Sequence, residues 1–148
     1  MDILRVYLDV CCLCRPFDDQ TQPRNFIESQ AVLEILRNCG FTWTLVISDL
    51  IEFELAQIPD KMKYLQVYQN LPKNFEYVEV DDDVMTLYSR LVVCGCSPAD
   101  AMHVALSRKV KATFLTTDDL LLGIIRRTSG DIIICDNPVT WLTRGDYV

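Results

Sequence analysis

Short apolar segments with β-strand character alternate with helical patterns along nearly the whole chain. The segments that predict strands are residues 3–9, 41–47, 75–80, 112–116 and 131–135. The segments that predict helices are residues 26–39, 60–71 and 118–128, and stretches that begin near Asp49, Asp82 and Pro98. Strands separated by helices pair in parallel, and the helices cover both faces of the sheet. The alternation therefore predicts an α/β fold with a central, mostly parallel sheet.

Local signals support several of these helix boundaries. Ser97 is a good N-cap, because proline follows at the first helical position and Asp100 at the third. Asp49 and Glu52 have the spacing of a capping box at the start of another helix, which Pro59 is expected to end. Each helix is thus predicted to begin shortly after a strand ends.

Length and hydropathy indicate one folded domain over residues 1–148. The chain has 148 residues, half of them hydrophobic, which excludes a disordered protein. No apolar run approaches the roughly 18 residues of a membrane span. The first residues do not resemble a signal peptide, because Asp2, Arg5 and Asp9 interrupt any apolar core. We therefore expect a cytoplasmic protein with no membrane partner.

Charge and cysteine content limit the possible functions. Lys and Arg number 14 and Asp and Glu number 21, so the net charge is −7. This acidity argues against a broad basic face for nucleic acid, although a small site can still use metal ions. The seven cysteines cannot all pair, and one histidine makes a structural zinc site improbable. Reduced cysteines in apolar segments fit a reducing compartment.

Common nucleotide and hydrolase motifs are absent from the sequence. The five glycines form neither a dinucleotide-binding loop nor a P-loop, and there is no Gly-x-Ser-x-Gly elbow. Ligands of open α/β sheets bind beyond the carboxyl ends of the strands. The polar residues expected at these strand ends are therefore the candidates for a functional role.

Four carboxylates follow strands or lie in the first turns of helices. They are Asp9, Glu54, Asp100 and Asp118. If the sheet order brings them together, they repel one another and favour a bound cation. An all-oxygen set selects Mg²⁺ or Mn²⁺, which can activate water and bind a scissile phosphate. The pattern predicts metal-dependent nuclease chemistry.

At these positions the chain resembles the PIN-domain family and, within it, the VapC-type toxin ribonucleases. The matching segments are residues 6–9, 47–55, 97–101 and 114–118. The resemblance implies a three-layer α/β/α fold, Mg²⁺- or Mn²⁺-dependent cleavage of RNA, and the family's acidic positions at Asp9, Glu54, Asp100 and Asp118. It also implies a toxin, generally a homodimer, that is inhibited by a cognate antitoxin peptide. Cys11 stands where the family usually has a small hydroxyl or amide residue.

Simpler structural roles compete with these assignments. Asp100 can serve only the helix start, and either Asp118 or Asp119 can cap its helix while the other faces the cleft; the resemblance favours Asp118 for the cleft. Glu52 and Glu54 lie about 200° apart on one helix, so Glu52 is expected to cap and Glu54 to face the site. His103 is expected to pack in the core, where it can support Asp100.

Residues and functions remain open beyond this set. Arg15 and Arg24 can meet substrate phosphates or lie on the solvated surface. Two other functional classes also need acids at strand ends or the same fold. One is a receiver-like domain in which an aspartate accepts a phosphoryl group with Mg²⁺. The other is a PIN-like domain that only binds a partner.

Overall fold

The computed structural model describes residues 3–145 and contains a central parallel sheet. Its strands are β1 (Arg5–Leu8), β2 (Thr44–Ser48), β3 (Glu76–Val78), β4 (Thr113–Leu115) and β5 (Cys135–Asp136). Every pair of neighbours is parallel, and the order is β3-β2-β1-β4-β5. The predicted α/β class and parallel sheet are confirmed.

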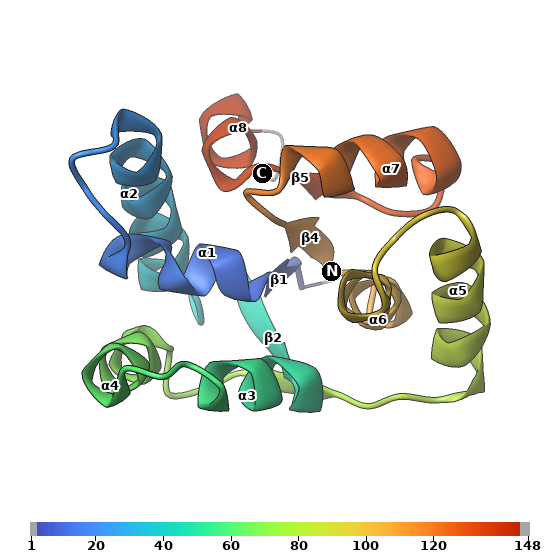
Figure 1. The fold of residues 1–148 in the computed structure, drawn as a ribbon, viewed down its shortest axis with the longest axis horizontal. Helices are drawn as coiled ribbons and strands as arrows, with labels where there is room; N and C mark the ends of the chain where they lie inside the picture. Colours follow the sequence, from blue (N-terminus) through green and yellow to red (C-terminus); the bar gives the residue numbers. More distant parts are fainter. Residues whose placement is uncertain (1–2, 146–148) are drawn as a thin grey trace.

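Helices lie on both sides of this sheet, as Figure 1 shows. The helical elements are α1 (Val10–Cys14), η1 (Arg15–Phe17), α2 (Pro23–Arg37), α3 (Asp49–Ala56), α4 (Lys61–Asn70), α5 (Asp82–Val93), α6 (Pro98–Lys109), α7 (Asp119–Ser129) and α8 (Pro138–Arg144). In the view of Figure 1 the strands form a central column, with α2 and α4 on one side and α5 and α6 on the other. The arrangement is the three-layer α/β/α architecture that the sequence predicts.

The central strand β1 lies at the centre of the core. Val6, Tyr7 and Leu8 have no exposed surface, and Phe114 and Leu115 of the neighbouring β4 are equally buried. A strand covered by helices on both faces has no solvent side, which explains why this segment is a continuous apolar run. Because Asp9 follows β1 directly, the core fixes the position of that carboxylate.

Several predicted boundaries are wrong, and the strand expected over residues 41–47 is Thr44–Ser48. The helix expected from residue 26 begins at Pro23, since proline is favoured at the first helical position. The predicted capping box at Asp49 is not formed, because Ser48 is the N-cap of α3 and accepts from the Ile51 N–H at 3.3 Å. The last strand is Cys135–Asp136 and not residues 131–135.

The structure contains a short helix, α8, at a position where the sequence analysis predicts no helix. Asn137 caps α8 by accepting from the Val139 N–H at 2.8 Å. Trp141 of this short helix packs against Trp43, with ring centroids 4.9 Å apart. The helix therefore forms through an N-cap, Pro138 at its first position and one aromatic anchor.

The strand order also tests the receiver-like alternative. Receiver-type flavodoxin-like sheets have the order 2-1-3-4-5. Here β1 lies between β2 and β4, and β3 lies at the edge beyond β2. The receiver-like interpretation is therefore wrong at the level of topology. Among residues 3–145 no helix is long and apolar enough to cross a bilayer.

Candidate active site

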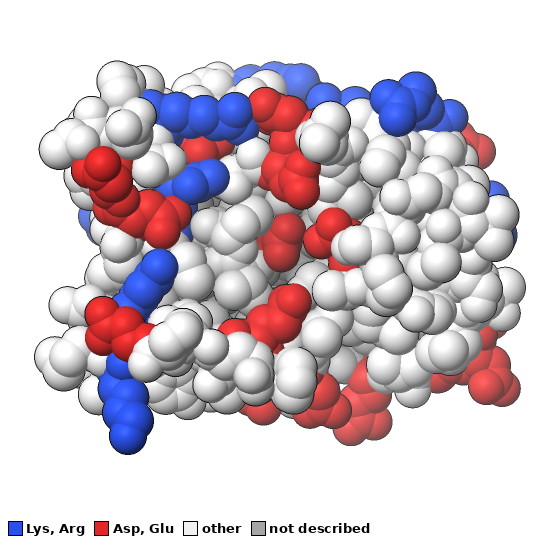
Figure 2. Space-filling model, viewed as in Figure 1, with Lys and Arg blue, Asp and Glu red and all other residues white. Residues whose placement is uncertain are grey.

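Polar residues gather where the central strands end. Asp9 follows β1, Ser48 ends β2, and Thr116 follows β4. The backbone N–H of Asp9 donates to the Leu115 carbonyl at 2.9 Å and so extends the pairing of β1 with β4. Acidic side chains occupy the middle of the face shown in Figure 2, over the region between α1, α3 and α6. The structure thus has a polar edge where the sequence predicts one.

Asp9 is the most buried of the four predicted carboxylates, at 8% exposure. The Thr116 hydroxyl donates to Asp9 Oδ2 at 2.9 Å. Burial raises the pKa of Asp9 above its ordinary value, and the nearby carboxylate of Asp100 raises it further. His103 and the hydrogen bond from Thr116 act in the opposite direction. A cation beside Asp9 would stabilise its charged form.

Glu54 lies in the second turn of α3, and its carboxylate contacts the ring of His103 in α6. The contact joins Glu54 Oε1 to His103 Nε2. On the other side of the ring, Nδ1 lies 2.7 Å from the hydroxyl oxygen of Tyr7. His103 is 1% exposed, and burial raises the pKa of Tyr7 well above its usual range. The predicted packing role of His103 is incomplete, because the ring bonds at both nitrogens and contacts Glu54.

Asp9, Glu54 and His103 form one compact group. Each offers a ligand atom, and these atoms all lie within 4.8 Å of one another. Carboxylate oxygens are the ligands that Mg²⁺ and Mn²⁺ prefer. The upward pKa shift of Asp9 indicates local crowding by burial and negative charge, which a cation would relieve. The residues present therefore fit a divalent metal ion.

Asp100 lies beside this group without belonging to it. Ser97 caps α6 by accepting from the Asp100 N–H at 3.3 Å. Asp100 thus takes part in the helix start through its backbone, which is the structural role that the sequence left open. Its half-buried carboxylate is near enough to raise the pKa of Asp9. Asp100 thus contributes negative charge to the edge of the group.

Asp118 has a different position from the one expected. Its Oδ1 caps α7 by accepting from the Leu121 N–H at 3.1 Å. Asp119 instead forms an ion pair with Arg24. Asp118 is therefore the capping residue, so the expectation that Asp119 caps the helix is wrong, while the site role of Asp118 stays a prediction. Asp118 still lies near the site, because its N–H donates to the Thr116 hydroxyl that binds Asp9.

Glu52 and Glu54 point to different surroundings, as their spacing predicts. Glu52 accepts from the Tyr77 hydroxyl at 3.3 Å, whereas Glu54 contacts His103. Tyr77 also donates to Asp49. The expected capping role of Glu52 is wrong because Ser48 caps α3.

The two arginines that the sequence left open are held by internal ion pairs. Arg15 contacts Glu28 at 3.1 Å and donates to the Thr117 hydroxyl at 2.8 Å. Arg24 contacts Glu28 and Asp119 and donates to the Thr117 carbonyl at 2.9 Å. Both therefore support the loop after β4 instead of standing free for substrate phosphates.

Three residues important to this arrangement were not singled out in the sequence. Tyr7 is inside an apolar strand, Ser48 precedes the predicted cap, and Thr116 reads as a strand residue. A polar atom in a fully buried strand needs a hydrogen-bond partner, so Tyr7 was the one available signal. Cys11 Sγ lies 3.4 Å from Thr116 Oγ1.

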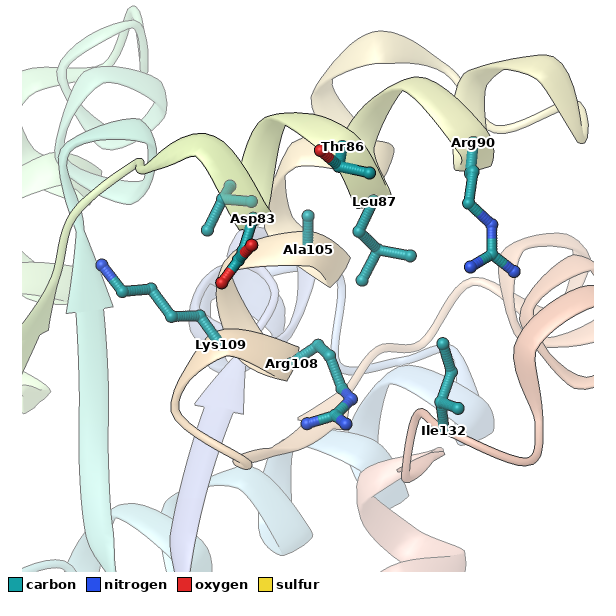
Figure 3. A pocket seen from close by; sticks show the side chains of 9 residues that line it. Asp83, Thr86, Leu87, Arg90, Ala105, Arg108, Lys109 and Ile132 are labelled. Atoms are coloured by element: carbon teal, nitrogen blue, oxygen red, sulfur yellow. The ribbon is translucent and has the colours of Figure 1, made fainter.

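A second surface region has the opposite charge. Two adjoining hollows of about 340 and 310 Å³ share Arg108 and Ile132. Figure 3 shows Arg90 of α5 and Arg108 of α6 on either side of Ile132 in the first hollow. Asp83 is the one carboxylate lining this first hollow, which lacks a ligand set for a divalent cation.

Comparison with solved structures supports the fold. The chain is similar to the structure of FitAcB from Neisseria gonorrhoeae, with a TM-score of 0.59, 14% identity and coverage of 90% of this chain and 97% of that one. It is also similar to VapBC-1 from nontypeable Haemophilus influenzae, with a TM-score of 0.64, 10% identity and coverage of 91% and 98%. For VapBC2 from Rickettsia felis, bound to a DNA fragment from its promoter, the TM-score is 0.57, identity 11%, and coverage 90% and 98%.

Sequence comparison gives no further assignment. No family model and no curated protein matches the chain. The similarity to FitAcB and the VapBC proteins therefore concerns the fold, which covers nine tenths of this chain. The resemblance to the PIN-like fold of VapC-type proteins is confirmed at this level.

Proposed function

We propose that the protein is a metal-dependent endoribonuclease that hydrolyses phosphodiester bonds of RNA with Mg²⁺ or Mn²⁺. The observation that carries this proposal is the approach of Asp9 and Glu54 within 4.8 Å at the carboxyl edge of a parallel sheet. This edge is where open α/β sheets bind their ligands. The fold shared with FitAcB and the VapBC proteins supports the same conclusion.

The proposed site has two levels of acidic residues. Asp9 and Glu54 hold the cation directly, while Asp100 and Asp118 complete the ligand set around it, directly or through water. Asp118 uses Oδ1 for its cap, so its Oδ2 is the atom for this purpose. When bound, the cation supplies the charge that neutralises the scissile phosphate and lowers the pKa of an attacking water. Thr116 keeps Asp9 oriented by donating to Oδ2.

The acidic surroundings also explain why the site needs a cation to accept RNA. Without one, the negative carboxylates repel the phosphodiester backbone. With a cation bound, the net local charge falls and the phosphate oxygen gains a ligand position. The protein is therefore expected to bind RNA weakly when divalent ions are removed by a chelator.

The decisive experiment is cleavage of labelled RNA in the presence of Mn²⁺ or Mg²⁺. We expect the wild type to cut, and Asp9→Asn and Glu54→Gln to lose cleavage by at least a hundredfold. Glu52→Gln is the matched control, because it makes the same chemical change two residues away on the same helix. Wild-type protein that is folded and binds RNA without cutting it would support the non-catalytic alternative instead.

The same proposal includes a protein partner. Crystal structures of VapBC and FitAcB proteins share this fold, and the acidic site can accept a basic side chain through charge-assisted hydrogen bonds. We propose that the protein is the toxin of a toxin–antitoxin pair, a homodimer inhibited by a peptide that inserts an arginine or lysine among Asp9 and Glu54. Expression in the natural host should arrest growth, and Asp9→Asn should relieve the arrest. Harmless expression of active wild type would leave the ribonuclease and exclude the toxin role.

A further inference from the structure

A buried chain of hydrogen bonds ends at Glu54 and is not explained by metal binding alone. Ser48 Oγ lies 2.7 Å from Tyr7 Oη, and Tyr7 Oη lies 2.7 Å from His103 Nδ1. His103 Nε2 then contacts Glu54 Oε1. Ser48 and His103 are each 1% exposed and Tyr7 has no exposed surface. The chain therefore joins β1, β2, α6 and α3, with three buried members and a fourth, Glu54, whose side chain is 29% exposed.

The number of hydrogens limits how this chain can be arranged. An ionised carboxylate can only accept hydrogen bonds. The contact between His103 and the Glu54 carboxylate therefore requires a hydrogen on His103 Nε2. Nδ1 can then accept from the Tyr7 hydroxyl, which in turn accepts from the hydroxyl of Ser48. Ser48 Oγ uses a lone pair for the Ile51 N–H that caps α3. When the hydroxyls donate in this direction, from Ser48 through Tyr7 to His103, every polar atom of the chain has a partner, as burial requires.

In the neutral ring, the reverse direction leaves Nε2 without a hydrogen. Its lone pair would then face the oxygen of Glu54, and the contact would be repulsive unless Glu54 were protonated or a cation lay between them. With a cation between them, His103 would be a metal ligand. The two directions thus assign opposite roles to the same ring.

Resting on the proposed function, we propose that His103 is a positioning residue that donates its Nε2–H to Glu54 Oε1 and is not itself a metal ligand. Glu54 is then held by one oxygen and offers Oε2 to the cation. Tyr7 and Ser48 fix the ring from behind, in the way that hydrogen-bonded partners orient metal-binding groups in other proteins. The metal therefore meets oxygen ligands, which favours Mg²⁺ or Mn²⁺ over ions that prefer imidazole.

Two substitutions of His103 separate the possible roles. His103→Gln places an amide N–H near the position of Nε2, whereas His103→Asn keeps a polar atom near Nδ1 and removes the contact with Glu54. We expect Mn²⁺ affinity, measured by electron paramagnetic resonance, to fall at least tenfold in His103→Asn and to recover to within about threefold in His103→Gln. Both variants are compared at matched folded fractions from thermal unfolding.

Other results for this pair would overturn the proposal. Full Mn²⁺ affinity in His103→Asn with loss in His103→Gln would show that the contact of the ring with Tyr7, and not the one with Glu54, supports metal binding. Equal loss in both variants would identify His103 as a ligand, and equal retention would show that Glu54 needs no donor. A wild type that binds no Mn²⁺ would refute the proposed function. The hydrogen on His103 Nε2 would still be tested by nitrogen NMR of the metal-free protein.

Nitrogen NMR of the wild type gives a second readout that does not depend on any variant folding. The chain contains one histidine, so ¹⁵N-histidine labelling produces the signals of a single ring. We expect a hydrogen on Nε2 in the metal-free protein and in Mg²⁺. Loss of that hydrogen on addition of Mg²⁺ would show direct ligation by Nε2 and contradict the proposal.

Discussion

Replacing Glu54 by glutamine is expected to stabilise the metal-free fold while weakening metal binding. Asp9 and Glu54 offer oxygens within 4.8 Å of each other, and two unit charges at that distance repel by about 3 kcal/mol at an effective dielectric constant of ~20. Glutamine removes this repulsion and still accepts from His103. The hydrogen bond loses roughly 1–2 kcal/mol because it is no longer charge-assisted. The free energy of unfolding should therefore rise by roughly 1–2 kcal/mol.

The assays are thermal unfolding without metal and Mn²⁺-dependent cleavage of RNA. The stability gain corresponds to roughly 2–4 °C per kcal/mol for a chain near this length. Loss of one of two direct ligands should reduce cleavage by about 10²–10³-fold. Glu52→Gln, whose carboxylate contacts Tyr77, should keep cleavage near the wild-type rate. A lower melting temperature with normal cleavage in Glu54→Gln would refute both parts of the reasoning.

Three further predictions follow from neighbouring contacts. Ser48→Ala removes the cap of α3 and a partner of the buried Tyr7 hydroxyl, so chemical denaturation should show a loss of about 2–3 kcal/mol. Mn²⁺ at about 100 times its Kd should stabilise the wild type by about 2.7 kcal/mol in thermal unfolding, and Asp9→Asn should abolish this gain. The ion pair with Arg24 lowers the pKa of Asp119, so its stabilising effect is present above its unfolded pKa and lost as the pH falls through the folded pKa. Asp119→Asn should therefore lower the melting temperature at neutral pH but not near pH 2, and an equal loss at both would contradict this origin.

The fold was predictable because the apolar strand segments and the helical segments between them indicate the same architecture. Continuous apolar strands require a sheet covered on both faces, and helical segments of sufficient length lie between them. Ser97 with Pro98 marks the start of α6, as expected. Asp9 at the end of the central strand was predictable for the same reason, since a buried strand fixes the direction in which the chain leaves it.

The errors come from alternatives that differ by one position or depend on tertiary contacts. Ser48 and Asp49 are both good caps; in the structure Ser48 caps α3, and its hydroxyl also lies 2.7 Å from the hydroxyl oxygen of Tyr7. Asp118 and Asp119 are similarly equivalent in the sequence, and the ion pair of Asp119 with Arg24 leaves the cap to Asp118. No local pattern contains these distant partners.

The same limit applies to the histidine. Tyr7 and His103 are separated by 96 positions, and their hydrogen bond depends on how α6 packs against the central strand. The apolar neighbours of His103 correctly predict its burial but not its partners. A histidine among apolar helix positions therefore indicates that its buried ring needs a hydrogen-bond partner from another part of the chain.

The most direct test of the central claim is a crystal of the protein soaked in Mn²⁺ and measured at a wavelength where manganese scatters anomalously. The account predicts a peak bound by carboxylate oxygens of Asp9 and Glu54, with Asp100 and Asp118 facing it and His103 Nε2 still in contact with Glu54. Asp9→Asn crystals treated in the same way should lose the peak. A manganese ion bound elsewhere, with the space between Asp9 and Glu54 empty in wild-type crystals, would contradict the account.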